Sequence, residues 1–232
     1  MSREPIQAVI FDLDGVLVDS EPNYLESERV LFGKYGVTFT AEMKVPYIGL
    51  STKEMLERVI VEFDLAVPLG VLVEEKNAIY LRLAAEHTPV NAPMRRLVEL
   101  LRDHGYPLAV ASGSSSAAID VVLRHTGLDD FFDVVVSAES VPRGKPEPDL
   151  FLEAARRLSV PPAACVVVED SGYGVTAARR AGMRCIAIPY GDGLSMGDAF
   201  AKADLLLGGS MASVDADSVF AWIRGDATPA AR

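Results

Sequence analysis

The sequence predicts an α/β fold in which a doubly wound parallel sheet carries a small all-helical cap, inserted directly after the first strand. From residue 93 onward, short apolar runs alternate with amphipathic helical segments, which is typical of a parallel sheet covered by helices on both faces. Between residues 20 and 88, helical patterns occur and no convincing strand does. We therefore expect a Rossmann-like core from residues 1–19 and 89–232, and a helical cap from residues 20–88.

The first strand and the cap follow from local patterns. The apolar run at residues 8–11 has the composition of a buried strand, and Gly15 follows shortly after it. Ser51 and Glu54 match a capping box, which marks the start of a helix. Prolines within 88–93 mark a return linker to the core. The helical spacing of apolar residues in the cap predicts helices over 21–35, 52–63 and 69–86.

The core pattern continues with alternating strands and helices. The expected strands lie at residues 107–111, 134–136, 165–168, 185–188 and 205–207. The expected helices lie at residues 94–104, 116–125, 148–158, 171–181, 195–202 and 217–223. Residues 225–232 form no clear pattern and are expected to fray.

Composition and charge disfavour several classes of partner. The formal net charge is −11, which disfavours binding to nucleic acid and to anionic membrane surfaces. The amino-terminal segment has no signal-peptide pattern, and no apolar run approaches the ~20 residues of a membrane span. Cys165 and Cys185 lie in apolar runs and are expected to be buried free thiols. We expect a cytoplasmic protein that binds neither nucleic acid nor membrane and is a monomer or a weak homo-oligomer.

Polar side chains follow three of the expected strands at the point where each strand ends. Asp12 and Asp14 follow the first strand. Two later strands end in Ser112-Gly113-Ser114 and in Glu169-Asp170. The carboxyl ends of parallel strands meet at one crevice, which is where such folds bind ligands. Alternate residues of a strand point the same way, so Asp12 and Asp14 are expected on one side unless the backbone turns between them.

Each of these elements alone has an ordinary explanation as a turn, a helix cap or a surface lysine. Together, at successive strand ends, they fit phosphoryl transfer. Asp12 is then the candidate nucleophile, and Asp14 the candidate general acid and base. Lys145, on a loop between a glycine and two prolines, is the candidate cation that offsets the charge of Asp12 and the phosphate.

The same crevice is expected to bind a phosphate and a metal ion. The candidate phosphate donors are the Ser112 hydroxyl and the backbone N–H groups of Gly113 and Ser114. Crowded carboxylates repel each other, and Mg²⁺ is the expected compensation because it prefers oxygen ligands. The candidate metal ligands are Asp12, Asp14, Glu169 and Asp170.

These residues resemble the haloacid dehalogenase-like hydrolase superfamily. The four motifs of that family are matched by Asp12-Leu13-Asp14-Gly15, Ser112, Lys145 and Glu169-Asp170, and the match extends from about residue 8 to residue 189. The resemblance implies Mg²⁺-dependent hydrolysis of a small phosphorylated metabolite through an aspartyl-phosphate on Asp12. Asp19-Ser20-Glu21 resembles the branch of phosphatases that includes sugar phosphatases.

The resemblance also implies that cap residues select the substrate. The candidates are Glu21, Leu50, Ser51, Lys53 and Lys76. A β-phosphoglucomutase-like activity is the alternative, because Gly49-Leu50-Ser51 and Lys76-Asn77 match features of that branch. Tyr24 stands where that branch usually has a histidine, which favours the phosphatase. Asp14 argues against dehalogenation, in which no leaving group needs a proton. A non-catalytic binding scaffold is a third hypothesis, and the intact set of four motifs argues against it.

Overall fold

The computed structural model describes residues 4–47, 52–189 and 198–226. A six-stranded parallel sheet forms the centre of the core, in the order β3-β2-β1-β4-β5-β6. Its strands are β1 (Ala8–Phe11), β2 (Leu108–Ser112), β3 (Val134–Ser137), β4 (Cys165–Glu169), β5 (Arg184–Ala187) and β6 (Leu205–Leu206). The predicted doubly wound sheet is therefore confirmed, with β1 in a central position between β2 and β4.

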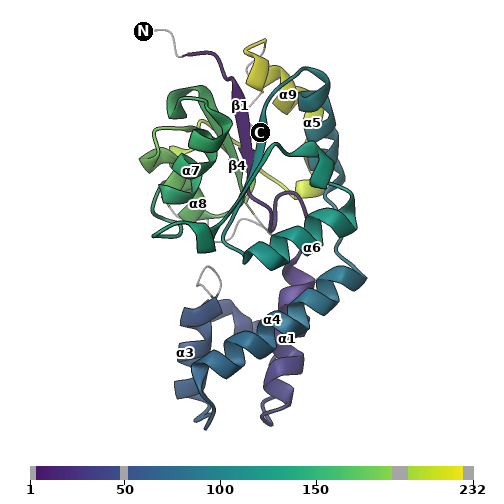
Figure 1. Ribbon diagram of the computed structural model, residues 1–232, viewed down its shortest axis with the longest axis vertical. Helices are drawn as coiled ribbons and strands as arrows, with labels where there is room; N and C mark the ends of the chain where they lie inside the picture. Colours follow the sequence, from purple (N-terminus) through teal and green to yellow (C-terminus); the bar gives the residue numbers. More distant parts are fainter. Residues whose placement is uncertain (1–3, 48–51, 190–197, 227–232) are drawn as a thin grey trace.

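Helices cover both faces of this sheet (Figure 1). One face packs against α5 (Ala92–Asp103), α6 (Ser116–Thr126) and α9 (Ala216–Arg224), and the other against α7 (Asp149–Leu158) and α8 (Gly172–Arg180). Val9 and Phe11 of β1 belong to the first apolar cluster, whereas Ala8 and Ile10 belong to the second. The two-residue period of a strand explains this division, because successive side chains point to opposite faces.

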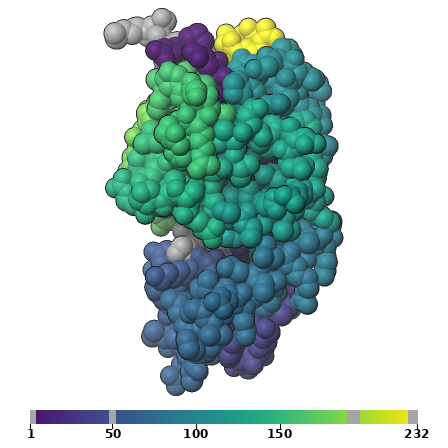
Figure 2. Space-filling model, in the orientation of Figure 1, coloured from purple at the N-terminus to yellow at the C-terminus, as the bar shows by residue number. Residues whose placement is uncertain are grey.

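The cap forms a second lobe below the core (Figures 1 and 2). Its helices are α1 (Glu21–Gly33), α2 (Ala41–Lys44), α3 (Thr52–Glu62) and α4 (Leu69–Glu86). Leu31, Phe32, Leu56 and Leu72 are fully buried at its centre, so the cap has an apolar cluster of its own. The short helix α2 was not predicted, because its single turn is too brief to show a helical period.

Two antiparallel linkers join the cap to the core. Val18 forms an isolated antiparallel bridge with Val90. The N–H of Asp19 donates to the carbonyl of Pro89 at 2.9 Å, and the N–H of Asn91 donates to the carbonyl of Leu17 at the same distance. The chain thus leaves and re-enters the core side by side, directly beyond β1. Helix α4 of the cap also packs against α6 of the core.

Short 3₁₀ helices complete the described part of the chain: η1 (Val45–Tyr47), η2 (Asp129–Phe131), η3 (Ala138–Ser140), η4 (Pro162–Ala164), η5 (Phe200–Lys202) and η6 (Met211–Ser213). The helix expected over 195–202 is a 3₁₀ turn where it is described, and its first residues lie outside the described ranges. The Ser51 end of the predicted capping box also lies outside them. Cys165 and Cys185 are buried and free, as expected. None of the described helices is long and apolar enough to cross a lipid bilayer.

Candidate active site

A tight turn after β1 separates the two aspartates of the first motif. The N–H of Asp12 still donates to the carbonyl of Val168 on β4 at 3.0 Å, so Asp12 continues the sheet. The chain then turns at Gly15, whose φ of +76° favours glycine, and the N–H of Gly15 donates to the carbonyl of Val18 at 2.8 Å. Asp12 and Asp14 consequently contact different sets of neighbours.

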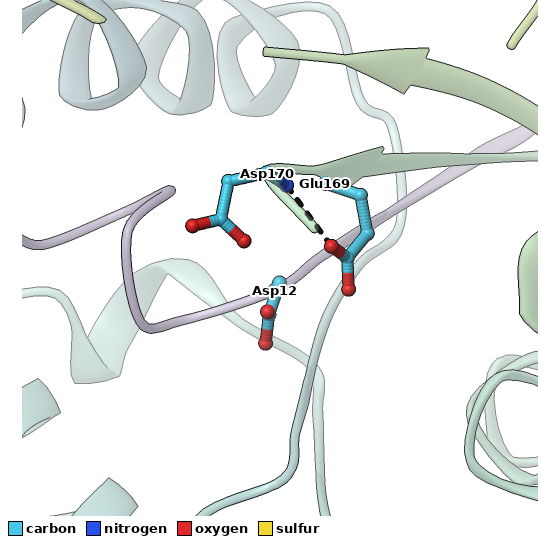
Figure 3. Close-up of side chains that lie close together, drawn as sticks. All are labelled: Asp12, Glu169 and Asp170. Carbon is cyan, nitrogen blue, oxygen red and sulfur yellow. Dashed lines mark hydrogen bonds between the residues drawn. The ribbon is translucent and has the colours of Figure 1, made fainter. Parts of the chain in front are cut away.

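Asp12 lies in an acidic cluster with Glu169 and Asp170 (Figure 3). One carboxylate oxygen from each of the three residues lies within 4.8 Å of the others. Asp12 follows β1, whereas Glu169 ends β4 and Asp170 follows it, so pairing of these neighbouring strands brings the cluster together. The prediction that polar strand ends converge therefore holds for these three side chains.

Lys145 links two members of this cluster. Its Nζ lies 3.0 Å from Asp12 Oδ2 and 2.5 Å from Glu169 Oε1. Glu169 is fully buried, and its Oε2 accepts hydrogen bonds from the N–H of Asp170 and from the N–H and hydroxyl of Ser171, at 2.8–2.9 Å. Both oxygens of Glu169 are thus engaged by protein donors. From helix α8, Arg180 donates to the carbonyl of Pro146 at 3.1 Å and holds the loop that carries Lys145.

Burial and mutual repulsion perturb the acids of this cluster. Burial is the largest cause that raises the pKa of Asp12, to about 8, and the charges of Glu169 and Asp14 add to it against the opposing effect of Lys145. Burial likewise raises the pKa of Asp170, together with the charges of Glu169 and Asp12. Burial alone would lower the pKa of Lys145, but Asp12 and Glu169 outweigh it and raise that pKa, so the ammonium stays charged. The cluster therefore carries excess negative charge that a cation would neutralise.

The donor set of the cluster fits a hard divalent cation. No hydrogen bond to the Asp170 carboxylate occurs among residues 4–47, 52–189 and 198–226, so its oxygens remain available. A Cβ on Gly15 would lie 1.9 Å from Asp170 Oδ2, so this glycine allows the close approach of backbone and carboxylate. Carboxylate oxygens are the ligands that Mg²⁺ prefers. Asp12 and Asp170 would hold the ion, and Glu169 instead binds Lys145.

Asp14 turns away from the acidic cluster and accepts three hydroxyl donors. Ser20 Oγ donates to Asp14 Oδ1 at 2.6 Å. Ser112 Oγ and Ser114 Oγ donate to Asp14 Oδ2, at 3.2 and 2.7 Å. The structure thus brings Ser112 and Ser114 to Asp14, as their places at a strand end suggested, and leaves Gly113 exposed beside them. The Asp14 carboxylate is not one of the three acids of the cluster formed by Asp12, Glu169 and Asp170.

The predicted cap residues fall into two groups. Lys76 is buried, with its Nζ 3.2 Å from Glu28 Oε1, and Glu21 Oε2 lies 2.6 Å from Lys44 Nζ. Lys53 is instead on an exposed face of α3, 4.0 Å from Glu57, and the structure does not bring it to the other candidates. Leu50 and Ser51 lie outside the described residues.

Sequence reasoning did not identify Lys44 and Glu28 as part of this cap cluster. Lys44 Nζ lies 3.6 Å from Glu28 Oε2, so two lysines and two glutamates form one charged group. Glu21 and Glu28 are seven residues apart and therefore on one face of α1, a signal that could have found Glu28. Lys44 lies on the single turn of α2, which gave no signal.

Helix α8 passes so close to the Glu169 side chain that only glycine fits at position 174. A Cβ at this position would lie 1.8 Å from Glu169 Oε1 and 1.9 Å from Glu169 Cδ. Gly174→Ala should therefore displace Glu169 and lower the free energy of unfolding by about 1–3 kcal/mol. Activity should fall as well, because Glu169 holds Lys145. Denaturant unfolding and kcat/KM measure both effects.

Gly70→Ala is the matched control for this prediction. Gly70 lies in helix α4, and a Cβ there has nothing within 4 Å among the described residues. Alanine is the better helix former by up to about 1 kcal/mol, so Gly70→Ala should be neutral or stabilising. An equal gain in stability from Gly174→Ala would show that Glu169 is not packed against that glycine.

Comparisons with known proteins agree with this geometry. The profile of the haloacid dehalogenase-like hydrolase family matches residues 9–188. The fructose-1-phosphate phosphatase YqaB of Escherichia coli is 35% identical over 189 residues, which cover 80% of this chain and 97% of the relative. A phosphorylated carbohydrates phosphatase of Thermotoga maritima is 33% identical over 218 residues, covering 92% and 96%. The solved structure of a β-phosphoglucomutase from Clostridium difficile superposes with a TM-score of 0.78 at 28% identity, covering 95% and 96%. The chain belongs to the haloacid dehalogenase-like hydrolase family.

Proposed function

We propose that the protein is a phosphatase that hydrolyses small phosphomonoesters through a covalent aspartyl-phosphate on Asp12. The observation that carries the proposal is the separation of the two aspartates. Asp12 lies against Lys145 and the acidic pair, where a phosphoryl group can be neutralised, whereas Asp14 is held by hydroxyl groups on another side of the turn. This separation supports different roles for the two carboxylates in the proposal, in which Asp12 attacks phosphorus and Asp14 transfers a proton.

The proposed reaction has two steps, formation of the aspartyl-phosphate and its hydrolysis. An oxygen of Asp12 forms a bond to phosphorus as the bond between phosphorus and the ester oxygen breaks, and Asp14 gives its proton to that leaving oxygen. Water then attacks the phosphorus, its proton passes to Asp14, and the bond between phosphorus and Asp12 breaks to release phosphate. Lys145 stabilises the charge that develops on the phosphoryl oxygens. Of the three predicted phosphate donors, the Ser112 hydroxyl donates to Asp14 and the N–H of Ser114 donates to Ser112 Oγ in this structure, so the N–H of Gly113 is the remaining candidate.

Asp12 and Asp170 are the proposed ligands of Mg²⁺. When bound, the ion supplies positive charge that offsets the repulsion between these carboxylates and the substrate phosphate. Glu169 has a different task in this proposal. Because its two oxygens already accept bonds from Lys145, Asp170 and Ser171, it fixes the lysine rather than the metal.

A sugar or polyol monophosphate is the proposed substrate class. Two relatives are named as phosphatases of fructose 1-phosphate and of phosphorylated carbohydrates. The cap cluster supports the same class, because Lys44 and Lys76 are compensated by two glutamates. This group carries no net positive charge with which to bind a second phosphate, whereas its exposed carboxylate, that of Glu21, can accept hydrogen bonds from sugar hydroxyls.

Phosphate release from a panel of phosphorylated metabolites tests the proposal. We expect Mg²⁺-dependent release from hexose and hexitol monophosphates, and a fall of about 10²–10³-fold in kcat/KM when a chelator removes the ion, since a catalytic metal contributes several kcal/mol. Excess Mg²⁺ should restore the activity. Glucose 1-phosphate belongs in the panel, because conversion to glucose 6-phosphate without phosphate release would identify a mutase instead. No turnover of any monoester would favour a binding scaffold.

A further inference from the structure

A chain of hydrogen bonds connects the cap to the proposed general acid. Tyr24 on α1 lies with its Oη 2.8 Å from Ser114 Oγ, and Ser114 Oγ donates to Asp14 Oδ2 at 2.7 Å. A serine hydroxyl has one proton. While Asp14 is ionised, Ser114 uses that proton on the Asp14 carboxylate, and the Tyr24 hydroxyl is then the donor to Ser114. In this ionised state of Asp14 the chain of donors runs from the cap tyrosine through the core serine to Asp14.

Three cap side chains hold the Tyr24 ring in place. The ring stacks on Tyr80 of α4, with centroids 4.4 Å apart and planes inclined by 23°. The ammonium groups of Lys44 on α2 and Lys76 on α4 lie 5.6 and 5.3 Å from the ring centroid. These lysines are themselves fixed by ion pairs to Glu21 and Glu28 of α1. Stacking and cation–π contacts each restrict the ring, so its hydroxyl is presented to Ser114 in one place.

We infer that Tyr24 is a positioning residue for Asp14, acting through Ser114, so that the cap orients the group that protonates the leaving oxygen. The inference rests on the proposed phosphatase function and goes beyond it, because Tyr24 takes no part in the transfer itself. Burial and the charge of Asp14 raise the pKa of Tyr24 well above its usual range, which keeps the phenol protonated and able to donate. Without the phenol, Ser114 Oγ loses its donor and can rotate away from Asp14, and proton transfer loses its alignment.

Tyr24→Phe tests this inference, because it removes one oxygen and keeps the ring and its stacking. A sugar phosphate leaves as an alkoxide and needs the proton of Asp14, whereas p-nitrophenyl phosphate releases a stable phenolate without it. We expect kcat/KM to fall about tenfold for the sugar phosphate, the size of one lost hydrogen bond in a network, and to change less than about threefold for the aryl phosphate. KM for the sugar phosphate should change little.

Ser114→Ala provides the second variant. It should cause the same selective loss, and the double variant Tyr24→Phe/Ser114→Ala should be no slower than Ser114→Ala alone, because both changes break one chain. Tyr106→Phe is the control: this tyrosine precedes β2 at the opposite end of the sheet and packs against Phe220. It should leave both substrates unaffected.

The outcomes separate this inference from the function on which it rests. Equal losses with both substrates, independent effects of the two substitutions, or no loss at all would each overturn the role of Tyr24. In all three cases the wild-type protein still releases phosphate, so the proposed function survives. Absence of phosphate release from both substrates by the wild-type protein would overturn the function and this inference together.

Discussion

Asp12→Asn is expected to lower kcat/KM for any phosphomonoester substrate by about 10⁴–10⁶-fold, the loss typical of removing a covalent nucleophile. The amide is a poor nucleophile for phosphorus, and it cannot form the aspartyl-phosphate. Lys145 keeps its partner Glu169 in the variant, so the remainder of the cluster stays in place. Phosphate release with saturating Mg²⁺ measures the effect, and acid-quenched protein should contain no phosphoenzyme. Substantial turnover by this variant would exclude Asp12 as the nucleophile.

The same variant should be folded, and without metal it should be more stable than the wild type at alkaline pH. Burial raises the pKa of Asp12 to about 8 in the folded protein, against 3.8 for the ordinary group. Folding therefore disfavours the charged carboxylate, and the wild type loses stability as pH rises from about 4 to 8. Asparagine is neutral throughout, so its advantage should grow over this interval. Thermal unfolding in a chelator at pH 5 and pH 8 provides the comparison, and an advantage that shrinks with rising pH would contradict the burial of a charge at this position.

The strand-end residues could be predicted from the sequence because topology alone brings them together. Asp12 and Glu169-Asp170 follow or end apolar runs, and in a parallel sheet the ends of neighbouring strands lie at one edge. Lys145 could also be predicted from the sequence, because two prolines restrict its loop to few conformations. Assigning these residues to one site requires no knowledge of where their side chains point, and the structure does bring Lys145 into contact with Asp12 and Glu169.

The direction of Asp14 could not be predicted in the same way. The two-residue period assigns Asp12 and Asp14 to one side, but it holds only for a continuous strand. The turn at Gly15 interrupts the strand, and Asp14 consequently reaches Ser20 and Ser114 instead of the acidic cluster. Ser20, which the sequence distinguished only as part of Asp19-Ser20-Glu21, is a direct partner of Asp14 in the structure.

Cap residues were the hardest to assign, because their roles depend on how separate helices pack. Lys53 and Lys76 are both lysines on amphipathic helices, and no local pattern distinguishes them. In the structure Lys76 faces Glu28 in the interior, while the Lys53 side chain is 71% exposed. Burial decides between a solvated and an interior lysine, and burial is a property of tertiary packing rather than of helical spacing.

Lys145→Met should be the most destabilising single substitution among Lys145 and the three acids of the cluster it contacts. The variant leaves Glu169, which is 0% exposed, and Asp12 without the cation that both contact. Breaking a buried ion pair by removing one partner costs about 3–5 kcal/mol, because the remaining charge stays buried and unpaired. Activity should fall as well, because a phosphate would meet three carboxylates with no lysine between them. Denaturant unfolding and kcat/KM with saturating Mg²⁺ measure the two effects.

Two further variants show whether buried charge causes the loss of stability. Lys34→Met removes a 48% exposed lysine that pairs with Glu75, and it should change stability by less than about 1 kcal/mol, because solvent screens such pairs. Lys145→Met/Glu169→Gln removes the stranded charge, so it should regain part of the stability lost in Lys145→Met without regaining activity. If the double variant is less stable than Lys145→Met by the full cost of Glu169→Gln alone, then the lysine does not stabilise the protein through its ion pair with Glu169. Its cation–π contact with Phe151, whose ring centroid lies 5.1 Å from Nζ, would then account for the loss.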